Sequence, residues 1–366
     1  MHSKALAPEY QGPLTKLSVN ASIADVLAEG ERHLKEAELV GSPQDVARAG
    51  LAVAEAHRRL GHVQEADRAW KASYRAARSA GDTGAMAWAL WSGGTLARQR
   101  GGLRLAFRLL RLAADLGKAG GDVVARGYSL AGLAETGRIQ GDYRTVAALH
   151  EQLLTEARAR GEARHTVWAL EGIAQIHRNT GSFDTALEMF EEAARLAGDA
   201  DDRRGRAWAL RGMADIISVR DNDPERALAL LAEAELSCRA MKLSSALAYN
   251  HKMRANVLYR ARRYEEARTV YEGALAEFRA MTEPRGEALA RLGLVKSLAR
   301  LGRDRARTAA DLDELRRTLD RIGLLNARDM VDKAYAELGV TPADGLPPAD
   351  DIAAAERAAA PVGGRR

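Results

Sequence analysis

The sequence has 366 residues, of which 46% are hydrophobic and 29% are charged, and its formal net charge is +5 at pH 7. A chain of this length can bury a large core, and dispersed charges of both signs favour an anionic or mixed partner without requiring nucleic acid. A single cysteine, Cys238, excludes an internal disulfide framework, and the absence of a long apolar stretch or of an apolar signal-peptide region predicts a cytoplasmic protein that does not enter a membrane.

Helix-forming residues dominate from end to end, because Ala, Leu, Arg and Glu are abundant and β-branched residues are sparse. The first segment, 1–19, is expected to be flexible, and a helix follows over about 20–39. Repeating units are expected over about 47–325, with a final helix over 326–338. These elements form one predicted domain, 20–340, and 341–366 are expected to be a flexible tail.

A forty-residue interval relates the units to one another. It aligns turn glycines in HRRLGHVQEA (57–66), ARQRGGLRLA (97–106), GRIQGDYRTV (137–146) and HRNTGSFDTA (177–186). It continues through ISVRDNDPERA (217–227), LYRARRYEEA (258–267) and, more loosely, LARLGRDRAR (298–307). Each unit is predicted to consist of helix A, a short turn, helix B and a connector, which gives about seven units.

Small and aromatic residues recur at fixed places in each unit. The fourth unit has Ile173, Ala174, Gly181, Phe183, Ala186, Phe190 and Ala193 in this order. This pattern resembles the tetratricopeptide repeat. The resemblance implies an all-α fold, an α-solenoid of about seven repeats in a right-handed superhelix, with the helices at 20–39 and 326–338 as caps. The units depart from the usual 34-residue length and lack its terminal Pro, and in this they are similar to extended repeats of peptide-binding scaffolds and bacterial regulatory proteins.

A second face of helix A carries aromatic, polar and arginine residues that the core pattern does not require. With the turn glycine as position 15, this face holds positions 2, 5, 9 and 12. Its candidate ligand-binding residues are Trp88, Tyr128, Trp168, Trp208 and Tyr249 at position 2, Trp91, Glu171, Arg211 and Lys252 at position 5, Glu135, Gln175, Asp215 and Asn256 at position 9, and Arg98, Arg138, Arg178 and Tyr259 at position 12. The resemblance implies that this face lines the concave groove of the superhelix.

Glycines at position 6, namely Gly132, Gly172 and Gly212, are predicted to leave room beside this face for a ligand. A purely structural interpretation stays open for each of these rows. The aromatics would then pack between repeats, the glycines would allow helices to approach, and the arginines would form a solvated face paired with carboxylates.

The sequence favours a non-catalytic binding or scaffold protein whose groove holds a peptide or protein segment. Because arginine at position 12 is lost after unit four, an acidic segment is expected beside units one to four. The alternative is an enzyme or biosynthetic-pathway auxiliary that binds a small molecule in the same groove. The common metal, nucleophile and nucleotide motifs are absent from the sequence, so no catalytic residue, metal ligand or cofactor is assigned. Direct nucleic-acid binding is not expected, and self-association is left open.

Overall fold

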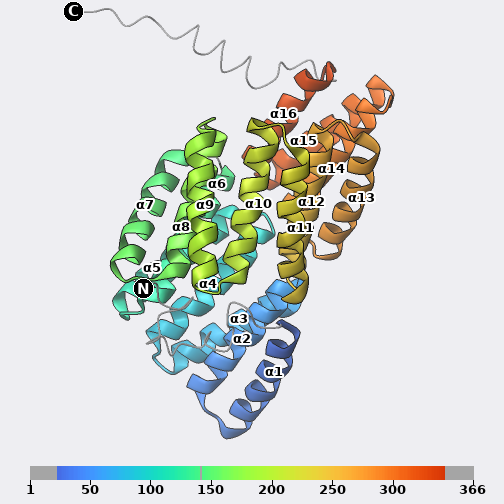
Figure 1. The fold of residues 1–366 in the computed structure, drawn as a ribbon. Helices are drawn as coiled ribbons and strands as arrows, with labels where there is room; N and C mark the ends of the chain where they lie inside the picture. Colours follow the sequence, from blue (N-terminus) through green and yellow to red (C-terminus); the bar gives the residue numbers. More distant parts are fainter. Residues whose placement is uncertain (1–22, 141, 343–366) are drawn as a thin grey trace, which may run out of the picture.

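Sixteen helices make up the described part of the chain, residues 23–140 and 142–342, in the computed structural model (Figure 1). They are α1 (Ile23–Val40), α2 (Pro43–Leu60), α3 (Val63–Ser79), α4 (Thr83–Gln99), α5 (Leu103–Ala119), α6 (Val123–Gln140), α7 (Tyr143–Ala159), α8 (Ala163–Asn179), α9 (Phe183–Asp199), α10 (Arg203–Arg220), α11 (Pro224–Ala240), α12 (Ser244–Arg260), α13 (Tyr264–Ala280), α14 (Pro284–Arg300), α15 (Arg305–Ile322) and α16 (Leu325–Leu338). No strand occurs among the described residues.

Residues in the left-handed backbone conformation, with positive φ, lie at the turns between successive helices. Gly61 and Gly181 both have φ of 85°, a conformation that costs glycine little because it has no Cβ. In later units Asn222 (φ 52°) and Arg262 (φ 61°) take the same place. The turn is therefore kept where the glycine is lost, which explains why the repeat pattern weakens in the sequence but not in the structure.

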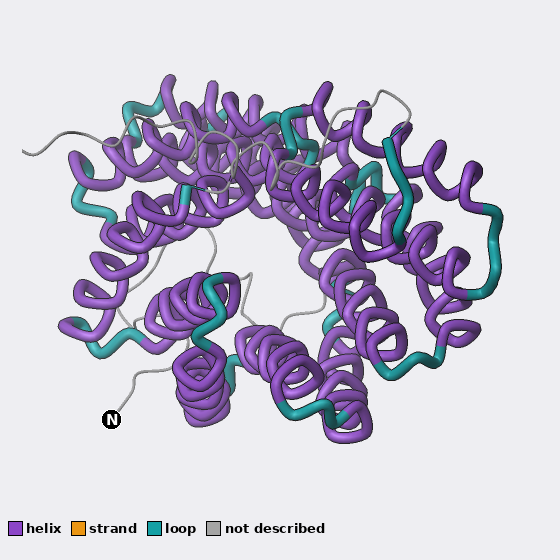
Figure 2. Tube along the Cα trace, turned by 90° about the horizontal axis from the view of Figure 1, so that it is seen from above, coloured by secondary structure: helices purple, strands orange, loops and turns teal. Residues whose placement is uncertain are grey.

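The helices form two layers around a common axis (Figure 2). Each helix packs against the next one in the chain, and the even-numbered helices from α2 to α14 also pack against one another. These even-numbered helices are the predicted helices A, and they form the inner layer. Small residues at their contacts, such as Ala54, Ala134, Ala174 and Ala214, are fully buried and allow close approach.

Helices that are distant in the sequence meet where the superhelix turns back on itself. Helix α12 contacts α2, and α16 contacts α6. Met241 and Leu243, at the turn between α11 and α12, belong to the same buried cluster as Trp88. At Gly61, an added Cβ would lie only 2.8 Å from Cγ of Met281. These contacts bring the two halves of the superhelix together around the space between them.

The structure confirms the all-α solenoid, but it contains more helices than seven repeats account for, since α1 and α16 extend the stack at its two ends. Helix α16 begins one residue earlier than expected, and the described part of the first helix begins at Ile23. The segments expected to be flexible, 1–19 and 341–366, lie outside the described residues except for 341 and 342. The domain boundaries at 20 and 340 stay predictions. No helix among the described residues is long and apolar enough to cross a membrane.

Candidate binding cavity

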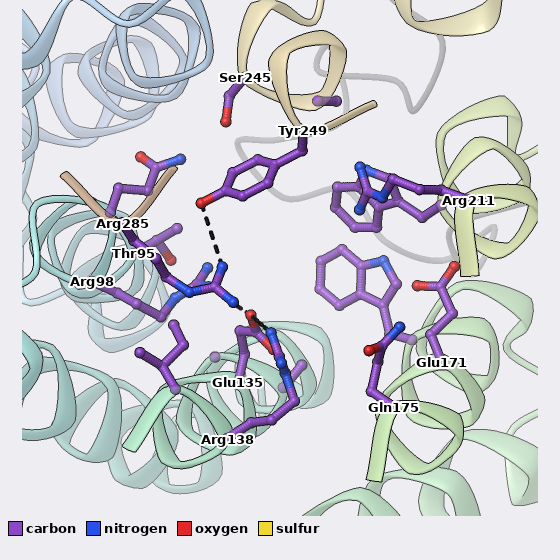
Figure 3. A pocket seen from close by; sticks show the side chains of 18 of the residues that line it. Thr95, Arg98, Glu135, Arg138, Glu171, Gln175, Arg211, Ser245, Tyr249 and Arg285 are labelled. Carbon is purple, nitrogen blue, oxygen red and sulfur yellow. Dashed lines mark hydrogen bonds and ion pairs between the residues drawn. The ribbon is translucent and has the colours of Figure 1, made fainter. Parts of the chain in front are cut away.

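A cavity of about 420 Å³ lies between the inner helices (Figure 3). Its size falls within the range of ordinary ligand sites, roughly 300–1,000 Å³. Most of the predicted groove residues line it, from helices α4, α6, α8, α10 and α12. They are Trp91, Arg98, Tyr128, Glu135, Arg138, Trp168, Glu171, Gln175, Trp208, Arg211, Tyr249 and Lys252. The helical spacing of positions 2, 5, 9 and 12 therefore places side chains from separate repeats around one space.

Five predicted residues lie outside the cavity lining: Trp88, Arg178, Asp215, Asn256 and Tyr259. Neighbouring protein groups hold them instead. Arg178 and Asp215 form an ion pair with each other at 2.8 Å. Asn256 accepts a hydrogen bond from the Tyr271 hydroxyl, and the Tyr259 hydroxyl donates one to Glu337, each at 2.7 Å.

Trp88 belongs to the core, and its side chain is fully buried. Its indole N–H donates a 2.9 Å hydrogen bond to Asp122, which also accepts from the backbone N–H of Ala125 in the first turn of α6. Tyr249 makes a similar contact, because its hydroxyl donates to Glu283, the capping residue of α14. Position 2 thus joins one inner helix to the start of the next, as the packing interpretation requires.

Replacing Trp88 with Phe is expected to lower the free energy of unfolding by about 1–3 kcal/mol, because the Asp122 carboxylate loses a buried donor. Trp91→Phe is the matched control on the same helix, since no acceptor for its indole N–H is found among the described residues. Urea denaturation of both variants checks this, and equal losses would contradict a role for the hydrogen bond.

The aromatic side chains form a continuous row along the cavity. The ring centroids of Trp91 and Tyr128 are 5.1 Å apart, those of Tyr128 and Trp168 are 4.7 Å apart, and those of Trp168 and Trp208 are 6.2 Å apart. The four residues come from four successive inner helices. Trp91 and Tyr128 are nearly fully buried in the same cluster as Trp88, so the area open to a ligand comes mainly from the Trp168 and Trp208 end of the row.

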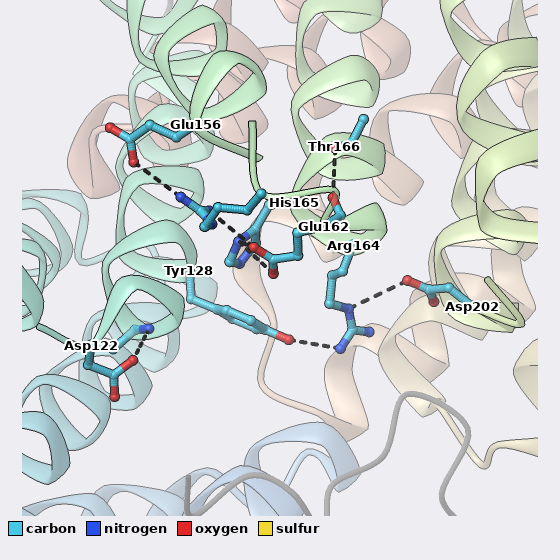
Figure 4. A network of polar contacts seen from close by, with 10 residues as sticks. Asp122, Tyr128, Glu156, Glu162, Arg164, His165, Thr166 and Asp202 are labelled. Atoms are coloured by element: carbon cyan, nitrogen blue, oxygen red, sulfur yellow. Dashed lines mark hydrogen bonds and ion pairs between the residues drawn. The ribbon is translucent and has the colours of Figure 1, made fainter. Parts of the chain in front are cut away.

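Buried polar contacts behind this row fix its orientation (Figure 4). The Tyr128 hydroxyl accepts a hydrogen bond from Arg164 at 2.8 Å, and Arg164 lies 3.5 Å from Asp202. Beside them, His165 contacts Glu162 at 2.9 Å. Because Asp202 also caps the start of α10, this network couples the aromatic row to the connectors between repeats.

The arginines of the predicted position-12 row are paired with carboxylates. Glu135 contacts Arg138 at 2.6 Å and Arg98 at 3.6 Å. Similarly, Glu55 contacts Arg58 at 2.7 Å. Burial alone would raise the pKa of the Glu55 carboxyl, but the charge and hydrogen bonds of Arg58 outweigh it and lower this pKa to about 2. These arginines therefore already have anionic partners inside the protein.

A family model for the tetratricopeptide repeat matches residues 165–235. This part of the chain contains tetratricopeptide repeats. The solved structure of a Rap protein complexed with competence and sporulation factor is similar in fold, with a TM-score of 0.63 and 13% sequence identity over 87% of this chain and 92% of that one.

Two further structures are similar only at TM-scores below 0.5. BtubC (BKLC) from P. vanneervenii has a TM-score of 0.43 at 19% identity, over 60% of this chain and 89% of its own. A STAND protein with a tetratricopeptide repeat sensor from Pyrococcus horikoshii has a TM-score of 0.47 at 14% identity, over 86% of this chain and 50% of its own. No curated protein sequence matches this chain.

Glycines at position 6 serve the packing of the tetratricopeptide repeats. An added Cβ would lie 2.8 Å from Leu110 at Gly132, 2.1 Å from the ring of His150 at Gly172, and 2.3 Å from Phe190 at Gly212. In each case the large side chain comes from helix B of the preceding repeat. The space that a Cβ would need is thus taken by the protein's own side chains, while all three glycines also line the cavity.

Several lining residues were not predicted from the repeat pattern, including Arg59, His150, Arg204, Ser245 and Arg285. The sequence spacing could have predicted Arg204 as a lining residue. It precedes Trp208 by four residues, one helical turn, just as Arg164 precedes Trp168. The guanidinium of Arg204 lies 4.8 Å from the centre of the Trp208 ring.

Two titratable groups in the cavity have shifted pKa values. Burial raises the pKa of the Glu171 carboxyl well above its usual range, with Arg211 opposing this shift. Burial and nearby arginines lower the pKa of the Lys252 ammonium to about 7, against an opposing effect of Asp215. In both groups the largest cause is burial, which removes the water that would stabilise the charged form.

Proposed function

We propose that this chain is a non-catalytic binding protein whose central cavity holds a peptide or protein segment. The observation that carries the proposal is the cavity itself, in which an aromatic row and charged side chains from successive repeats face the same space. Aromatic residues and arginine are the side chains that most often dominate binding energy at protein interfaces.

The similar fold of the Rap protein supports the proposal by analogy, since that protein was solved in complex with competence and sporulation factor. A shared fold does not transfer a ligand, so the partner of this chain is argued from its own residues. The polar groups along the aromatic row, Glu135, Gln175 and Glu171, offer hydrogen-bonding groups suited to an extended backbone.

The second candidate is a small-molecule ligand, as in a regulator or auxiliary of a biosynthetic pathway. The cavity volume of about 420 Å³ favours it, because this space suits a compact ligand as well as a few residues of a peptide. Native mass spectrometry separates the two candidates, because it distinguishes a bound peptide from a bound metabolite.

Native mass spectrometry of the protein isolated from its own source tests the proposal. We expect a discrete mass excess that disappears on denaturation, and fragments that form an amino-acid ladder. Trp208→Ala should reduce the occupied fraction, whereas Leu236→Ala, at a residue 71% exposed on α11, should not. A metabolite instead of a peptide would favour the second candidate. An equal occupied fraction in both variants would contradict binding in the cavity.

A further inference from the structure

The two halves of the cavity wall differ in how their positive charges are compensated. In the first half, Arg58 and Arg59 share the buried carboxylate of Glu55, and Arg98 and Arg138 share the half-buried carboxylate of Glu135. Each of these arginines has a carboxylate within 4.0 Å. An incoming anion would have to compete with these internal partners.

The part of the wall formed by the later helices α10, α12 and α14 carries positive charges without such partners. Its cationic lining residues are Arg204, Arg211, Lys252 and Arg285. Across the described residues, none of these four has a carboxylate within ion-pair distance. Figure 3 shows Arg211 beside Glu171 across the cavity from Arg98 and Arg285. Burial raises the pKa of the Glu171 carboxyl, and the charge of Arg211 opposes this shift.

Arg204 is the most confined of these cations. Its exposed fraction is 6%, it lies 5.5 Å from the Trp168 ring centre and 4.8 Å from that of Trp208, and its Nε has no hydrogen-bond partner among the described residues. The two indoles hold the planar guanidinium by cation–π attraction. A buried, preoriented guanidinium without an acceptor is a site where an anion gains most, since the cost of its desolvation is already included in the folded state.

Arg204, Trp208 and Arg211 share one face of α10, at spacings of four and three residues. We propose that this face binds the oxyanion group of an anionic ligand, through Arg204 and Arg211, while a flat apolar part of the same ligand lies against Trp208. The inference rests on the proposed function, because it assigns a ligand class to the same cavity.

The oxyanion is a carboxylate or a phosphate, since both match the donor geometry of arginine. Its place differs from the sequence-based expectation of an acidic segment beside units one to four. The arginines expected to bind that segment have internal partners, whereas Arg204 and Arg211 have no carboxylate within ion-pair distance among the described residues. Lys252 from α12 also lines the cavity and adds positive charge, whereas Arg285 from α14 lies on the side of Arg98.

Fluorescence titration with two probes of the same ring system tests the proposal. 8-Anilinonaphthalene-1-sulfonate carries an oxyanion, and N-phenyl-1-naphthylamine lacks it. We expect the sulfonate to bind the wild-type protein at least about tenfold more tightly than the neutral probe, the size of one charge-assisted hydrogen bond. Arg204→Met and Arg211→Met should each remove most of that difference and leave binding of the neutral probe within about twofold. Displacement of the sulfonate by phenyl phosphate or by benzoate then distinguishes the two oxyanions.

Arg98→Met is the matched control, because Arg98 lines the same cavity but shares Glu135. It should change the affinity for the sulfonate by less than about twofold, since the Glu135 carboxylate already compensates its charge. Circular dichroism identifies any variant that fails to fold, and Arg211→Met supplies an independent measurement if Arg204→Met does so. Equal affinity for both probes, or a loss only in Arg98→Met, would overturn the anion site.

The probe titration and native mass spectrometry can give different results, so the anion site and the proposed function can fail independently. A bound peptide in native mass spectra, together with equal affinity for the two probes, would retain the proposed function and reject the anion site. Sulfonate binding that depends on Arg204 and Arg211, together with a bound ligand that is not a peptide, would retain the anion site and reject the peptide.

Discussion

Gly212→Ala should lower the free energy of unfolding, whereas Gly273→Ala should raise it. The added methyl group at residue 212 would lie 2.3 Å from the ring of Phe190, whose exposed fraction is 1%. Overpacking of this kind costs about 1–3 kcal/mol. Gly273 also lies within a helix, but nothing is found within 4 Å of its added Cβ. There the helix propensity of Ala acts alone and adds up to about 1 kcal/mol.

Urea denaturation of the two variants measures the difference. Adding Phe190→Leu to each variant tests the cause, because a smaller side chain should relieve part of the loss at Gly212 and leave the gain at Gly273 unchanged. Destabilisation by both alanines, or equal effects of Phe190→Leu on both, would show that contact with the ring is not what requires glycine at 212.

The repeats of the fold were predictable from the sequence. The repeat follows from local requirements, namely a left-handed residue at each turn and small residues such as Ala174 where helices meet. These requirements recur in every unit, so a single sequence reveals them. The turns at Asn222 and Arg262 keep the left-handed geometry without glycine, although Asn222 lies 41 residues after Gly181 rather than 40, and only the structure shows that this geometry is kept.

The candidate cavity was predictable to the extent that helical spacing determines it. Trp168, Trp208 and Tyr249 face the same space because each occupies position 2 of its repeat. Trp88 occupies such a position too, yet it is buried in a cluster that includes Leu243, from the turn before α12. That contact arises where distant turns of the superhelix meet, and a pattern within one unit contains no information about it.

The pairing of charges was equally beyond the repeat pattern. Glu135 lies between Arg98 of one repeat and Arg138 of its own, so one carboxylate serves two members of the predicted arginine row. Whether a cation is compensated depends on such contacts between repeats and on burial. The sequence therefore indicated which side chains line the cavity, but it placed the expected anion on the arginines that have internal partners.

Between pH 7 and pH 5, the wild-type protein should lose about 2 kcal/mol more stability than the His150→Phe variant. Burial lowers the pKa of the His150 imidazole to about 4. The charge of Glu135 raises this pKa and that of Arg138 lowers it. Neither ring nitrogen has a hydrogen-bond partner among the described residues. In the unfolded chain the imidazole protonates near pH 6.5, so from there down to pH 4 the unfolded state binds the additional proton and stability falls with pH.

Phe is the appropriate replacement, because Phe190 packs against Gly212 as His150 packs against Gly172 in the neighbouring repeat. Urea denaturation at the two pH values measures the difference between the proteins, and this cancels the contributions of His57 and His251, whose pKa values are shifted in opposite directions. At pH 7 the variant should be at least as stable as the wild type, since it no longer buries an unpartnered polar ring. An equal loss of stability in both proteins would mean that His150 binds a proton in the folded state as readily as in the unfolded one, and that its burial against Gly172 does not exclude the charge.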